Sequence, residues 1–73
     1  MFEPSWYRWP SIVVPVNSLP SVRDWANQQQ IRHERDYNWN AHISNGALDG
    51  IEVHFRDRED LVAFTLTYET IQD

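Results

Sequence analysis

The stretch from Ile51 to Tyr68 limits the choice of fold most, because it indicates a strand, a charged turn and a second apolar element. Ile51, Val53 and Phe55 alternate with polar residues, which is typical of a half-buried strand. Asp57 is placed to cap a helix, and the acids after it suit the positive end of the helix dipole. Apolar residues then follow at helical spacing. They are Leu61, Phe64, Tyr68 and Ile71.

The second element has a competing interpretation. Residues 62–68 also alternate between large apolar side chains and Ala or Thr, and several of them favour strands. A hairpin across residues 56–60 is therefore the alternative. We favour the helix, because acidic residues in a first turn stabilise the beginning of a helix. Tyr68–Asp73 is left as a candidate for a short fourth strand.

Two elements are expected before this stretch. Ile12–Val16 is β-branched and predicts a strand, in which Pro15 indicates an edge position or the strand's end. Ser18 is a candidate N-cap for a helix over Leu19–Ile31, since Pro20 is tolerated in an opening turn.

A hairpin is expected in the second half. Tyr37–Ile43 alternates as a strand, and the loop from Ser44 to Gly50 holds the turn dipeptides Asn-Gly and Asp-Gly. Pairing Ile43 with Ile51 closes this loop and gives one apolar sheet face. The residues expected to be buried on it are Trp39, Ala41, Ile43, Ile51, Val53 and Phe55.

The predicted order is β-α-β-β-α in one domain, residues 1–73. This is a small two-layer α+β sandwich with an antiparallel hairpin, similar to a ferredoxin-like fold that lacks its last strand. A sheet this small, in a chain with 14% aromatic residues, favours dimerisation or docking on a partner.

Composition excludes several classes of protein. Without cysteine there are no disulfides or thiolate metal sites, which fits a cytoplasmic location. We expect no membrane span and no secretory signal. Six arginines against eleven acids give a net charge of −5, which argues against direct nucleic-acid binding and permits a basic partner.

The first ten residues form an aromatic N-terminal arm, interrupted by Pro4 and Pro10. Such a segment either folds over its own core or binds a partner or second copy, because it would otherwise expose a large apolar patch. Its candidate partner-binding residues are Phe2, Trp6, Tyr7 and Trp9.

The polar face of the hairpin holds the candidate ligand-binding residues His42, Glu52 and His54. In the register above, His42 lies across from Glu52, and Asn40 across from His54. Two imidazoles and a carboxylate suit a metal, acid–base chemistry or a ligand. We favour the simpler explanation, that they belong to a solvated polar face of the sheet. Nothing matches a phosphate-binding loop or a nucleophile motif, so we expect no enzyme, cofactor or bound metal.

Residues 55–68 resemble the C-terminal segment of small uncharacterised proteins of tailed bacteriophages. The shared features are an aromatic-tipped strand, an acidic turn and an Ala-Phe-x-Leu-like element. The resemblance implies a viral accessory protein in the bacterial cytoplasm and carries over no functional residues.

The sequence therefore predicts a small acidic protein-binding module that binds or inhibits a host or viral protein and forms a homodimer. The alternatives are a ligand or metal module using the polar hairpin face, and a minor structural component of the virion.

Overall fold

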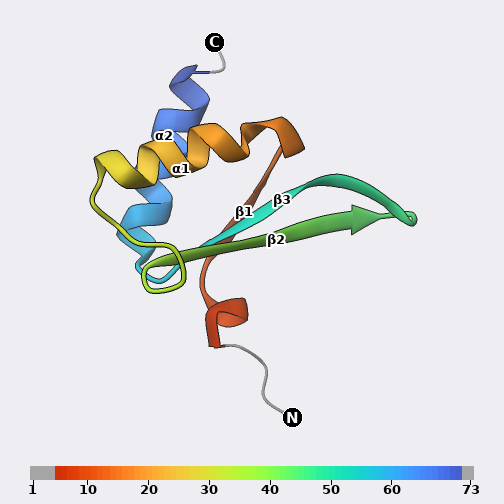
Figure 1. Cartoon of the computed structure of the whole chain (residues 1–73), viewed down its shortest axis with the longest axis horizontal. Helices are drawn as coiled ribbons and strands as arrows, with labels where there is room; N and C mark the ends of the chain where they lie inside the picture. The colour runs from red at the N-terminus through yellow and green to blue at the C-terminus, as the bar shows by residue number, and fades with distance from the viewer. Residues whose placement is uncertain (1–4, 72–73) are drawn as a thin grey trace.

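The computed structural model describes residues 5–71, and side chains from residue 6 to residue 68. Three antiparallel strands form a sheet in the order β1-β3-β2, and two helices cross over one of its faces (Figure 1). This confirms the predicted α+β class and the β-α-β-β-α order. The elements are η1 (Ser5–Arg8), β1 (Ser11–Val14), η2 (Val16–Ser18), α1 (Leu19–Gln28), β2 (Tyr37–Ser44), β3 (Ala47–Phe55) and α2 (Arg58–Ile71).

The second apolar element is a helix, as favoured, and it continues without an extended segment from Arg58 to Ile71. Asp57 precedes it, and its carbonyl accepts from the backbone N–H groups of Asp60 and Leu61. The predicted stripe faces the core as far as Tyr68, with Phe64 fully enclosed. A fourth strand from Tyr68 is therefore wrong for residues 68–71, while residues 72–73 lie outside the described chain.

Helix α1 begins at Leu19 as predicted but ends at Gln28, three residues before the predicted end. Gln30 has a φ of 61°, and the N–H groups of Gln30 and Ile31 return to the carbonyls of Asn27 and Ala26. This is a Schellman ending with glutamine where glycine is usual. Ser18 makes no side-chain cap bond. Its hydroxyl instead bonds the hydroxyl of Tyr68, at 3.1 Å.

The predicted hairpin forms, but its loop and its register were wrong. The turn contains only Asn45 and Gly46, both at positive φ, and β3 begins directly at Ala47. Tyr37, not Trp39, lies opposite Phe55. The shift is two residues with a bulge after His42, so the same side chains still share a face.

Gly50 explains the error, since it lies within β3 and not in a turn. An added Cβ there would come within 2.8 Å of a Val13 methyl and 2.9 Å of the Val14 carbonyl oxygen. Glycine therefore serves the close approach of β1 to β3.

Three aromatic rings, one from each of three elements, form the centre of the core. Trp25 of α1, Phe55 of β3 and Phe64 of α2 lie 5.3–5.8 Å apart between ring centroids. Ile51, Val53 and Phe55 are buried as predicted, but Trp39 is half-buried, and Ala41 and Ile43 are exposed. The hairpin projects beyond the helices (Figure 1), so its far end has nothing above it to bury these side chains.

No helix within residues 5–71 is long and apolar enough to cross a bilayer.

Candidate functional site

His54 is the most enclosed of the predicted ligand-binding residues. It lies on the sheet face opposite the helices, between Ser11 of β1 and Asn38 of β2, with 2% of its surface exposed. Its Nε2 atom is 2.8 Å from a carboxylate oxygen of Glu52 and 3.1 Å from the amide oxygen of Asn40. Both neighbours are acceptors, so Nε2 carries a proton. The Nδ1 atom has no hydrogen-bond partner among the described residues.

The aromatic arm is what buries His54. The Trp6 ring meets the imidazole edge-on, with centroids 4.9 Å apart, and the Tyr7 ring lies at 6.2 Å. Trp6 is half-buried, whereas Tyr7 remains 48% exposed. The fold thus brings together two sets of residues predicted separately, part of the arm and part of the polar face. Trp9 is half-buried, and Phe2 lies outside the described residues.

His42 does not join this group, because the register places it opposite Gly50 and not Glu52. The imidazole instead bonds the carboxylate of Asp49 at 2.5 Å, and this bond raises the pKa of His42. Asn40, predicted across from His54, pairs with Glu52. Across residues 5–71, no three His, Cys, Asp or Glu side chains are grouped closely enough to hold a metal ion.

The projecting hairpin exposes apolar side chains along a strand edge. Ile43 and Leu48 face each other near its tip, with 64% and 53% of their surfaces exposed. β2 pairs with β3 on one side only; on its other side a bridge from His33 covers Tyr37, and no strand of residues 5–71 continues it. β2 contains no lysine, arginine, acid or proline, residues with which proteins protect such edges.

Sequence reasoning missed one buried charge. Residues 32–36 carry mostly charged side chains, a composition typical of an exposed connector, yet Asp36 is only 4% exposed. Its carboxylate accepts from Arg35 and from the backbone N–H of Arg32, and it pairs with Arg56 at 3.0 Å. The bond from Arg35 is the main reason that the pKa of Asp36 is lowered. The alternation of acid and arginine in this segment was the available signal, but it did not identify the distant partner.

Comparisons with known proteins give no family for this chain. No protein-family model matches it, and neither a curated protein nor a solved structure matches it significantly. The resemblance of residues 55–68 to phage proteins stays a prediction.

Proposed function

We propose that this protein is a small non-enzymatic protein-binding module that works through the outer edge of β2. The observation that supports this most is an eight-residue edge strand without lysine, arginine, acid or proline, which presents Ala41 and Ile43 to solvent. Exposed strand edges of this kind pair with strands of other chains unless they are protected. Such pairing supplies main-chain hydrogen bonds for affinity, while the alternate side chains supply specificity.

A second copy of the chain fits this edge. Antiparallel pairing centred on Ala41 sets Trp39 of one copy opposite Ile43 of the other, so that the exposed isoleucine covers a half-buried indole. The same register sets Asn40 opposite His42 on the other face. Although the chain carries a net charge of −5, no like charges meet along β2, since the strand contains no acid, lysine or arginine and this register sets His42 opposite Asn40.

The pairing is limited at one end. His33 bridges Tyr37, and the Glu34 N–H already donates to the Tyr37 carbonyl at 2.7 Å. The Trp39 N–H also donates to the amide oxygen of Asn38, at 2.8 Å, so the free backbone of this edge begins at the Trp39 carbonyl. It spans the alternating segment from Trp39 to Ile43, which is the part that this register uses.

Light scattering from low to high micromolar concentration tests the dimer. We expect a dimer mass for the native chain and a monomer for Ile43→Lys, because lysine at this edge opposes pairing. Val62→Lys is the matched control, since Val62 is also about half exposed but lies on α2. Amides of residues 41–43 that point away from β3 should exchange slowly with solvent only in the dimer. A monomer mass at every concentration, with fast exchange at these amides, would refute the proposal.

The aromatic arm supports a second docking surface. Tyr7 and Val13 are both about half exposed on the sheet face that bears His54. This surface adjoins the carboxylate of Glu52, so it fits an apolar partner segment that carries a basic residue. Under the phage resemblance, the partner is a host or viral protein in the bacterial cytoplasm. Tyr7→Ala should weaken such a complex without unfolding the chain, whereas Trp6→Ala should also destabilise the fold, because Trp6 covers His54.

A further inference from the structure

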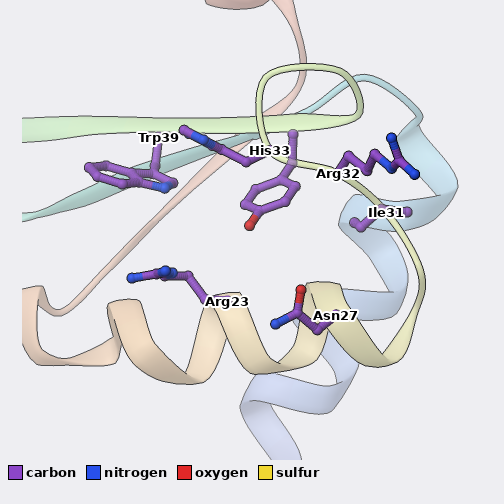
Figure 2. Close-up of a pocket in the computed structure, with 7 residues that line it drawn as sticks. Arg23, Asn27, Ile31, Arg32, His33 and Trp39 are labelled. Atoms are coloured by element: carbon purple, nitrogen blue, oxygen red, sulfur yellow. The ribbon is translucent and has the colours of Figure 1, made fainter.

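A cleft lies between α1 and the beginning of β2, on the helix side of the sheet. Its volume is about 450 Å³, within the range of small-molecule sites. Figure 2 shows Arg23 and Asn27 on α1, facing Trp39 and His33 across the opening. The seven lining residues are Arg23, Asn27, Ile31, Arg32, His33, Tyr37 and Trp39.

The charge of the cleft is opposite to that of the chain. Its lining includes two arginines and no acid, although the whole chain carries a net charge of −5. The Arg32 guanidinium points away from the opening (Figure 2), so Arg23 supplies the positive charge of the cleft. Arg35 and Arg56 pair with Asp36, but the guanidinium of neither Arg23 nor Arg32 pairs with a carboxylate among the side chains that the structure describes, residues 6–68. Arg23 and Asn27 are four residues apart on α1 and therefore lie on one side of the helix. Together they present a guanidinium and an amide to the same opening.

The opposite wall is aromatic and held in place. The rings of His33 and Trp39 are stacked at 21°, with centroids 5.6 Å apart. His33 is fixed by a 3.0 Å hydrogen bond between its Nε2 atom and the amide oxygen of Asn38. Trp39 remains half-buried, so part of its indole is open to the cleft. An indole face binds flat unsaturated rings by stacking.

Tyr37 adds a hydrogen-bond donor. Burial raises the pKa of its hydroxyl, against the opposing charge of Arg23. The hydroxyl therefore stays protonated at neutral pH and can donate to an acceptor in the cleft.

We propose that this cleft binds a small molecule that joins a planar aromatic ring to an anionic group, with the ring against Trp39 and the anion held by Arg23 and Asn27. Two common sources share this chemistry, aromatic carboxylates and nucleoside monophosphates. Arginine suits either anion, because its guanidinium binds carboxylate and phosphate through paired N–H groups. This ligand site does not depend on the pairing of β2, but it shares Trp39 with that edge, so a paired second copy would compete with the ligand for the indole.

Calorimetry and amide NMR titrations with adenosine 5′-monophosphate and with indole-3-acetate test the proposal. Adenosine and inorganic phosphate are the probes that lack one half of the ligand. We expect at least one of the two complete probes to bind and to shift the Trp39 indole N–H and the Asn27 amide. Each half-probe should bind at least tenfold more weakly. Which complete probe binds identifies the source of the anion.

Three variants test the contacts. Arg23→Gln should weaken binding of the complete probe about tenfold or more, the effect of losing one charge-assisted contact. Trp39→Leu should do the same by removing the stacking surface. Arg8→Gln, at an exposed arginine of η1 outside the cleft, should change affinity less than twofold. Each variant must first give a native-like amide spectrum, and the titration is repeated on Ile43→Lys so that self-pairing does not affect it. Failure of both complete probes to bind in the millimolar range, or equal affinity in Arg23→Gln and Arg8→Gln, would overturn the proposal.

Discussion

Replacing Asp36 tests whether a short polar segment holds this small fold together. Its carboxylate ties the loop before β2 to the end of β3, because Arg35, Arg56 and the Arg32 backbone all converge on it. In addition, the Arg56 N–H donates to the Asp36 carbonyl at 2.8 Å, a bond that substitution leaves in place. We therefore expect Asp36→Ala to lower stability through the side chain alone.

The size of the loss follows from the exposure of the partners. A charge-assisted bond from a backbone N–H to a buried carboxylate contributes about 1.5–3 kcal/mol. The two arginines are half exposed, so each ion pair adds only about 0.2–1 kcal/mol. Asp36→Ala should thus cost about 2–5 kcal/mol. A domain of 73 residues has a total unfolding free energy of about 4–11 kcal/mol, so the loss is large. Asp36→Asn keeps an acceptor and should cost about 1–2 kcal/mol.

Urea denaturation followed by circular dichroism measures both variants. Because the pKa of Asp36 is lowered in the folded chain, its contribution is complete above the unfolded pKa of about 3.9 and is lost as the pH falls through the folded value. Burial and nearby acids raise the pKa of Asp60, so Asp60 acts in the opposite direction. Because the charge of Asp36 is one of the causes of the raised Asp60 pKa, the native chain and Asp36→Asn are compared in an Asp60→Asn background. Equal stability of the two at neutral pH, with equal acid sensitivity, would refute the role given to Asp36.

Three further changes test the packing and the turns. Val53→Asp should abolish the cooperative thermal transition, since the Val53 side chain is fully buried and the variant would place an unpaired charge there. A variant that still folds cooperatively would contradict the register. Gln30→Gly should stabilise the fold by about 0.5–1 kcal/mol, because glycine adopts a positive φ without strain. Gln28→Gly, inside α1, should destabilise it by about the same amount. If denaturation showed that both variants change stability in the same direction, the assigned helix ending would be wrong. Gly50→Ala should cost about 1–3 kcal/mol through the contact with Val13, and an unchanged melting temperature would show that β1 can move away.

The sequence predicted the elements better than their ends, and Asn45-Gly46 and Asp49-Gly50 show why. Both dipeptides carry the same local turn signal, yet only the first is a turn. What makes the second a strand position is the approach of β1, a contact that no local pattern contains. Similarly, the residue at positive φ after α1 is Gln30, where glycine is usual, so the sequence contains no glycine that would predict the end of the helix.

For the candidate site, too, local features were predicted and contacts between distant segments were not. Alternation predicted which face of the hairpin is polar, because a shift of two residues leaves faces unchanged. It did not predict the partners, and His42 was therefore assigned to a group that it does not join. The burial of His54 under Trp6 depends on how the arm crosses the sheet. The cleft at Arg23 was missed, since its walls come from two segments that only the fold brings together.

The pairing of β1 with β3 has a consequence for synthesis on the ribosome. Ser11 pairs with His54, so the first strand to leave the ribosome must wait for the third. The two-residue turn lets β2 and β3 close within microseconds, whereas a contact so distant in sequence closes late. Until β3 emerges, the apolar side chains of β1 and the aromatic arm are exposed together. β1 and the arm are therefore most open to premature association before β3, the strand that pairs with β1, has been made.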